Sequence, residues 1–476
     1  MTDDDDTLCL NGINALTGEY LAPPRALAET AQMARGGAPA AGLAGWFRGL
    51  VKRMTGGGKS YGLPADVNPI KIEEAGWGVV FPAGTPDAVR DALRPLLALR
   101  TQQAGVLYKE LDWRQGEGRE SWLARFGAHG ADVEPARVPY YLLLVGNPDV
   151  IPFEFQYELD VDYAVGRIAF DDAADYGLYA TAVADYEAGG TVPAAREIVY
   201  WGTRHPADRA TQLSADYLIG PLAAGEPAAG TVPAREPVVK KRGFGSRTLK
   251  GPDATRANLL DALRGPEHPA LLFTASHGMG GWPKGDPRQL SAQGALLCQD
   301  WAGFGAVQPS HYLAAANLGP EFDFRGTVAF VFACYGAGTP RFDNFLQNPG
   351  AGPQEIAERA FVSALARRLL AGGALAVVGH IERAWGYSFQ VPKVGAQLMP
   401  FRNFLGRVMD GEPVGHAMLD FGQRYASASV GLLNLLAPHQ PGTKAATDSA
   451  LVRLWVERND AQNYVLLGDP AVRLRV

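Results

Sequence analysis

Short apolar runs recur along the chain from about residue 137 onward, and stretches with helical periodicity separate them. The runs hardly alternate with polar residues, which is the pattern of parallel strands buried on both faces of a sheet. Strands that alternate with helices predict a doubly wound, mostly parallel α/β sheet with right-handed crossovers. The predicted strands lie within residues 137–152, 197–202, 270–276, 326–334, 373–380 and 463–468, and the predicted helices within 209–222, 253–265 and 355–373.

The beginning of the chain has a different character. Its first sixty-odd residues are rich in Ala, Gly and Pro, which favours linkers and turns. Within them, residues 43–54 carry an apolar stripe that predicts an amphipathic helix, docked on the protein's own core, on a partner or, as a further alternative, on a membrane surface. We predict a loosely organised segment at 1–65, a smaller α/β subdomain at 66–195 and a larger α/β domain at 196–476.

Composition narrows the class of protein. The chain has 476 residues, 47% of them hydrophobic and 20% charged, with a formal net charge of −6. It should therefore fold, and neither nucleic acid nor an anionic membrane is expected as its principal partner. A basic stretch at 238–250 is interpreted as a solvated strand and turn. The first residues are acidic, unlike a secretion signal, and no apolar run reaches the length of a membrane span, so we expect a cytoplasmic protein.

The three cysteines, Cys9, Cys298 and Cys334, lie far apart and form no CxxC pair. This spacing indicates neither a disulfide framework nor a cysteine-based zinc site. The histidines show no close metal-ligand spacing either, so we expect no metal and no other cofactor.

One imidazole and one thiol stand at the ends of predicted strands. His277 follows the strand at 270–276, and Cys334 ends the strand at 326–334. If the two strands are neighbours, both side chains lie at the carboxyl edge of the sheet, where α/β proteins bind ligands. An imidazole beside a thiol makes the thiolate available, and glycines such as Gly278 offer backbone N–H groups to an oxyanion, which together suit acyl transfer. The alternative is a core cysteine and a polar strand end.

These motifs resemble those of the caspase-fold cysteine peptidases. An apolar strand that ends in His-Gly and a later strand that ends in Ala-Cys occur here in the family's order, and the chain is most similar to the gingipain branch. "YYLLLVGNPDVIPFEFQYELDVDYAVGRIAF" and the terminal "NYVLLGDPAVRLRV" are similar to gingipain segments, so the resemblance covers residues 137–476. It implies an α/β/α sandwich in which His277 is the general base, Cys334 is the nucleophile, and the N–H groups of Gly278 and Cys334 form the oxyanion hole.

The sequence departs from the gingipain pattern at the carboxylate that orients the histidine, because Thr203 and Arg204 stand where it is expected. Either a Cys-His dyad operates or another carboxylate takes this place. Asp208 is the nearest match to an acidic residue of the substrate pocket, and it is also a good N-cap for the next helix.

Three residues after the strand at 373–380 are further candidates for binding substrate: Glu382, Arg383 and Trp385. The resemblance places Trp385 in a specificity pocket, whereas a core position is equally compatible with its side chain. Arg383 favours an acidic substrate residue, so the preferred residue at the cleavage site stays open.

The sequence thus predicts a cytoplasmic cysteine endopeptidase that cleaves protein or peptide substrates without a cofactor. The alternative is a catalytically inactive module of the same fold that binds partners, which the missing carboxylate favours. By analogy with the family, the N-terminal region is expected to bind a regulatory partner or to hold the enzyme inactive.

Overall fold

The computed structural model describes most of the chain. The described residues are 7–8, 12–22, 25–36, 62–129, 132–192, 194–228, 233–265, 267–343, 345, 353–391, 395–437 and 447–476. Cys9 and the helix predicted at 43–54 lie outside them.

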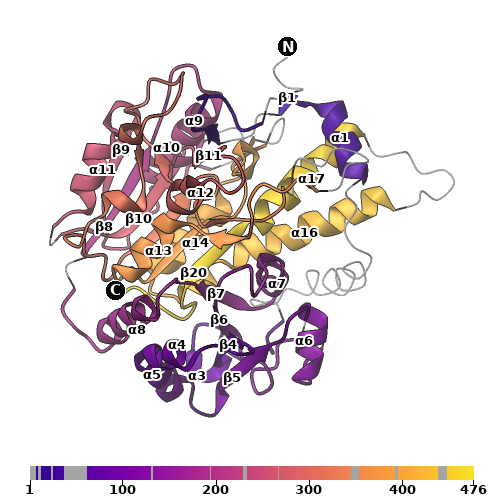
Figure 1. Cartoon of the computed structure of the whole chain (residues 1–476), viewed down its shortest axis with the longest axis vertical. Coiled ribbons are helices and arrows are strands. Elements are labelled where there is room, and N and C mark those ends of the chain that lie inside the picture. Colours follow the sequence, from indigo (N-terminus) through magenta and orange to yellow (C-terminus); the bar gives the residue numbers. More distant parts are fainter. Residues whose placement is uncertain are drawn as a thin grey trace.

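A single ten-stranded sheet forms the centre of the protein (Figure 1). Its strands are β4 (Trp77–Pro82), β5 (Tyr108–Trp113), β6 (Tyr141–Val145), β7 (Ala164–Ile168), β8 (Ala195–Gly202), β9 (Gly245–Lys250), β10 (Pro269–Ala275), β14 (Val328–Phe332), β17 (Ala376–His380) and β20 (Tyr464–Gly468). Their order across the sheet is β5-β4-β6-β7-β20-β17-β14-β10-β8-β9. All neighbours run parallel except β17 and β20, so two parallel blocks meet in opposite directions at that pair.

Helices flank this sheet, and the α/β class predicted from the sequence is confirmed. They are α1 (Leu27–Gly36), α3 (Ile72–Ala75), α4 (Asp87–Ala92), α5 (Arg94–Ala104), α6 (Arg119–Arg125), α7 (Phe153–Leu159), α8 (Ala173–Glu187), α9 (Arg209–Ser214), α10 (Gly220–Ala224), α11 (Arg256–Leu263), α12 (Pro287–Ala292), α13 (Ala364–Ala371), α14 (Met399–Met409), α15 (Val414–Ala417), α16 (Leu419–Leu436) and α17 (Asp448–Gln462). None of these helices, within the residues described, is both long and apolar enough to cross a membrane.

Two predicted helices differ from the structure. The first is split into α9 and α10 by a π-helical turn at Ala215–Ile219. In the second, only α13 is helical, because Phe361 and Val362 before it form β16 and pair with β15 (Gly338–Thr339). Phe361, which fitted the helical period, is thus drawn into a short antiparallel pair, a tertiary contact that local spacing does not encode. The basic stretch does form a largely exposed strand, β9, as predicted.

The sheet continues without a break across residue 195. The C-terminal strand β20 lies between β7 and β17 and so joins the block built from the earlier strands. The division into 66–195 and 196–476 stays a prediction, since one hydrophobic core spans both parts.

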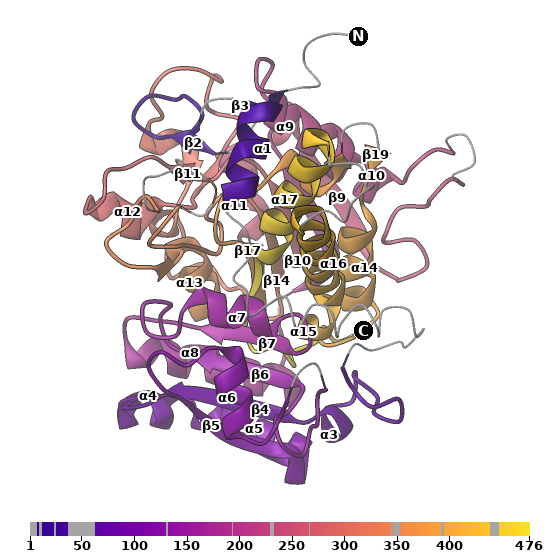
Figure 2. The same ribbon diagram turned by 90° about the vertical axis from the view of Figure 1, so that its right-hand side faces the viewer.

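Within the described part of the N-terminal region, α1 and β2 both contact the rest of the protein. Helix α1 lies along α17 in both views (Figures 1 and 2), and Ala31 and Ala34 pack into a cluster with Val452 and Trp455. The strand β2 (Ile13–Asn14) pairs in parallel with β11 (Met279–Gly280), which follows directly on β10 and His277. The remaining two-stranded pairs are β1 (Thr7–Leu8) with β3 (Arg25–Ala26), β12 (Leu296–Leu297) with β13 (Tyr312–Leu313), and β18 (Gln390–Val391) with β19 (Gly395–Ala396).

Candidate active site

The strands that carry His277 and Cys334 are neighbours, as the sequence analysis required. In the parallel pair β10–β14, Ala275 lies opposite Phe332, and His277 and Cys334 each follow two residues later. Adjacent strands are about 4.8 Å apart, so the imidazole and the thiol emerge side by side from one edge of the sheet.

The backbone makes a sharp turn at Cys334. Tyr335 follows with φ 57°, one of two non-glycine residues with positive φ in the described part of the chain. Such a conformation costs free energy and is found preferentially at functional sites. Gly278 packs so closely against this turn that a Cβ on it would lie 1.7 Å from the carbonyl oxygen of Cys334. Any side chain at position 278 would clash with the backbone of Cys334, so only glycine fits here.

The thiol of Cys334 is fully buried and lies among backbone donors. The N–H of Ala384 donates to its Sγ over 3.2 Å. Burial raises the pKa of this thiol to about 12, against the lowering effect of the Ala384 and Gly278 N–H groups and of the Arg383 charge. In this state the sulfur is therefore a neutral thiol.

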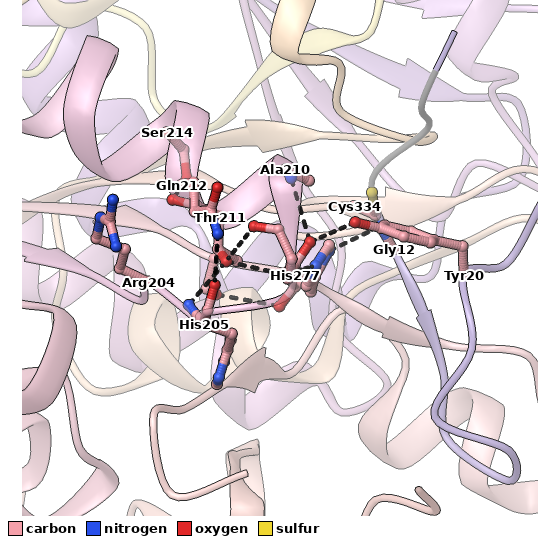
Figure 3. Close-up of polar contacts among 12 residues, drawn as sticks. Gly12, Tyr20, Arg204, His205, Ala210, Thr211, Gln212, Ser214, His277 and Cys334 are labelled. Atoms are coloured by element: carbon pink, nitrogen blue, oxygen red, sulfur yellow. Dashed lines mark hydrogen bonds and ion pairs between the residues drawn. The ribbon is translucent and has the colours of Figure 1, made fainter. Parts of the chain in front are cut away.

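His277 is buried and held from both ring nitrogens (Figure 3). Its Nε2 lies 2.6 Å from Oδ2 of Asp208, and its Nδ1 accepts the N–H of Gly12 over 3.0 Å. Because the Gly12 N–H is a donor, Nδ1 must carry a lone pair, so the proton of the neutral ring lies on Nε2 and points to Asp208. The carboxylate thereby fixes both the orientation and the tautomer of the imidazole.

Asp208 lies at the start of α9 and accepts four hydrogen bonds. The N–H of Ala210 donates to Oδ1 over 3.1 Å, so the predicted N-cap is confirmed. The hydroxyl of Thr211 donates to Oδ2 over 2.8 Å, and the Tyr20 hydroxyl donates to Oδ1. Burial works to raise the pKa of Asp208, but the His277 contact and the hydrogen bonds from His277, Tyr20 and Thr211 outweigh it and hold this pKa well below its usual range. Asp208 thus occupies the place of the orienting carboxylate that was not found at Thr203 and Arg204.

The candidate substrate residues after β17 are largely engaged inside the protein. Glu382 and Arg383 are both buried, and the Arg383 guanidinium makes a bidentate pair with Asp343, at 3.0 and 2.8 Å. Burial disfavours its charge, yet Tyr335, Glu382 and Asp343 outweigh this effect and hold the pKa of Arg383 well above its usual range.

Trp385 lies in a core cluster, where its ring is 5.0 Å from that of Phe345 and 6.4 Å from that of Trp455. Arg204 is exposed and pairs with Asp216 at 2.9 Å. Arg383, which favoured an acidic substrate residue, is thus already paired with Asp343.

The other cysteine described, Cys298, is buried, and its thiol donates to the carbonyl oxygen of Leu296 over 3.4 Å; burial raises its pKa. No three His, Cys, Asp or Glu side chains in the described ranges are grouped so that they could hold a metal ion.

No family model matches the chain, and no curated protein matches it in sequence. Among solved structures, one described as a protease aligns with 84% of this chain and 78% of its own, at 12% identity and a TM-score of 0.47. Two structures of the Saccharomyces cerevisiae separase–securin complex align at 10% identity with 71% and 70% of this chain, at TM-scores of 0.30 and 0.31. They match over 16% and 15% of those chains.

Sequence reasoning missed Gly12 and Tyr20, which reach His277 and Asp208 from the other end of the chain. Both lie in the segment predicted to be loosely organised. Neither has a neighbour in sequence that signals catalysis, because their role depends on pairing between β2 and β11.

Proposed function

We propose that the chain is a caspase-like cysteine endopeptidase in which Cys334 is the nucleophile, His277 the general base and Asp208 the residue that positions His277. The observation that carries this proposal is the fixed tautomer of His277. With Nε2–H bonded to Asp208, the lone pair of Nδ1 is directed to the side on which Gly12 and the Cys334 sulfur lie. A base oriented in this way next to a thiol is the arrangement of nucleophilic acyl transfer.

The proposed reaction has two halves. In the first, Nδ1 of His277 takes the proton of the Cys334 thiol, and the thiolate attacks the carbonyl carbon of the scissile peptide bond. The backbone N–H of Gly278, which lowers the pKa of the Cys334 thiol, is the proposed donor to the oxyanion. When the C–N bond breaks, His277 returns its proton to the leaving amine. In the second half, His277 deprotonates a water molecule that hydrolyses the thioester and restores the thiol.

The substrates proposed are proteins or peptides, and the reaction needs no cofactor. The cytoplasmic location and the identity of the preferred substrate residue stay predictions. With Arg383 paired to Asp343, an acidic preference would require this pair to open or to be shared with the substrate.

The test is the Cys334→Ala variant, compared with the parent chain on a peptide library with product detection by mass spectrometry. Cys298→Ala is the matched control, because Cys298 is equally buried and its thiol donates to the carbonyl oxygen of Leu296. We expect cleavage by the parent and by Cys298→Ala and none by Cys334→Ala. Peptide cleavage by Cys334→Ala in the Gly12→Ala background at the rate of Gly12→Ala alone would remove the proposal.

A second candidate function is that of an inactive module with the same fold. The observation in its favour is the full burial of Cys334, which raises the pKa of its thiol to about 12. A peptide carrying an alkylating group distinguishes the two functions. An active site captures the peptide on Cys334, whereas an inactive module leaves this thiol unmodified even when the site has been opened as described below.

A further inference from the structure

The N-terminal loop, defined here as residues 12–22, lies on the candidate active site. Its strand β2 pairs with β11, so that Ile13 lies opposite Met279, and the N–H of Ala15 donates to the carbonyl oxygen of Gly280 over 2.9 Å. The loop then folds back on itself, and the N–H of Leu21 donates to the carbonyl oxygen of Gly12 over 2.9 Å. These hydrogen bonds give the N-terminal loop a defined conformation that is paired with β11.

Apolar burial fixes the loop in this position. Ile13 and Ala15 are buried in a cluster with Met279, Trp282 and Trp301. On the far side, the N–H of Val307 donates to the carbonyl oxygen of Ala15 over 3.1 Å. The loop is thus held both by backbone hydrogen bonds, to Gly280 and Val307, and by apolar packing.

The loop also engages both groups proposed to prepare the nucleophile. Its Gly12 N–H occupies the Nδ1 lone pair of His277, and its Tyr20 hydroxyl bonds to Oδ1 of Asp208. The Tyr20 ring meets the His277 ring edge to face, with centroids 5.7 Å apart. Figure 3 shows these contacts together with Cys334. With its lone pair occupied, the imidazole has no acceptor for the thiol proton.

Gly12 lies between the base and the nucleophile. A Cβ built on Gly12 would lie 3.2 Å from Sγ of Cys334 and 2.7 Å from Cδ1 of Leu21. The Leu21 side chain also lies 3.0 Å from such an atom on Gly280, beside the ring of Tyr335. The loop therefore fills the space in which a peptide carbonyl would approach the sulfur.

We propose that the N-terminal loop is an intramolecular inhibitor that occupies a peptide-docking surface made of β11, His277 and Asp208, and that its release uncovers the site. This inference rests on the proposed function, since an inhibitor presupposes an activity. It also names the docking edge, which is β11 (Met279 and Gly280), and the occupant of that edge, which is strand β2 of the same chain.

The experiment loosens the loop without altering a catalytic group. In Gly12→Ala, the new methyl group meets Leu21 and the sulfur at a residue with φ 101°, a conformation that disfavours any side chain. Tyr20→Phe removes only the hydroxyl that bonds to Asp208 and is the second variant in case the first does not fold. The matched control is Gly84→Ala, which imposes the same kind of backbone penalty at φ 82° in a turn where nothing lies within 4 Å.

Two quantities are measured on the full-length chains. The first is the rate at which iodoacetamide alkylates Cys334, determined by peptide mapping with Cys298 as the internal reference, and the second is cleavage of the peptide library. We expect alkylation of Cys334 to rise about tenfold in Gly12→Ala and about threefold or more in Tyr20→Phe, with no change in Gly84→Ala. Peptide cleavage should rise in the same order.

The outcomes separate the two proposals. Unchanged alkylation in both loop variants, or cleavage by the parent chain as fast as by the variants, overturns the inhibitory loop and leaves the peptidase standing. Faster alkylation of Cys334 without any peptide cleavage supports occlusion of the thiol by the loop and overturns the peptidase.

Discussion

Replacing Asp208 by Asn removes one negative charge from the site and tests how His277 is held. Oδ2 of Asp208 accepts from His277 at 2.6 Å and from Thr211 at 2.8 Å, while Oδ1 accepts from the Ala210 N–H and from Tyr20. If the Asn carbonyl takes over the contacts of Oδ1, its NH₂ group faces Nε2–H of His277. The ring must then move its proton to Nδ1, where the N–H of Gly12 already points at it.

The magnitude follows from the bonds lost. A hydrogen bond to a charged group contributes about 1.5–3 kcal/mol, so losing two of them lowers the free energy of unfolding by about 3 kcal/mol or more. The wrong tautomer lowers kcat by roughly 10³- to 10⁴-fold, as for the carboxylate of other catalytic triads. The assays are urea unfolding of the full chain and peptide cleavage in the Gly12→Ala background.

The free energy that Asp208 contributes to folding depends on pH in a direction that its pKa determines. The pKa of Asp208 is depressed in the folded chain, so its contribution is complete above the unfolded pKa of about 4 and is lost as the pH falls through the folded value. The stability gap between parent and Asp208→Asn should therefore shrink below about pH 4. Asp216→Asn is the control, because this exposed carboxylate pairs with Arg204 at the surface. A gap that is constant from pH 7 to pH 3, or kcat within about threefold of the parent, would refute the reasoning.

Three further results are expected. Because burial raises the pKa of Cys334 to about 12, its alkylation in the parent chain should increase about tenfold per pH unit from pH 8 to 11, whereas a free cysteine levels off near pH 8.5; an early plateau would contradict this. Gly278→Ala should abolish cleavage and lower Tm, since its Cβ would lie 1.7 Å from a carbonyl oxygen, while Gly84→Ala keeps activity. Arg383→Gln should cost about 3–5 kcal/mol in urea unfolding by removing the charge that pairs with the buried carboxylate of Asp343; a loss below about 1 kcal/mol would contradict the buried pair.

The sequence alone was sufficient to predict that His277 and Cys334 lie at strand ends, because buried parallel strands leave a strong local signal. The runs before His277 and Cys334 are apolar throughout and so mark the two strand ends, whereas it is the pairing of β10 with β14 that puts both residues at one sheet edge. The contact between Asp208 and His277 was harder to predict from the sequence. An N-cap is a local property, whereas this contact depends on how α9 approaches β10.

The contribution of the N-terminal loop had no local signal at all. Gly12 and Tyr20 lie in a stretch whose composition indicates turns, and their positions depend on one short pairing with β11. The same limit explains the overextended helix before α13, where Phe361 and Val362 are drawn into a strand by their partner β15. In each case a contact distant in sequence overrides the local pattern.

The central claim is that Cys334, activated by His277, forms an acyl-enzyme. The most direct measurement is mass spectrometry of the acid-quenched Gly12→Ala chain after brief incubation with a peptide ester library. The account predicts an acyl group on Cys334, none on Cys298, and loss of this adduct in the additional variant His277→Ala. Folded Gly12→Ala chain that carries no adduct on Cys334, or that carries the same adduct when His277 is replaced, would contradict it.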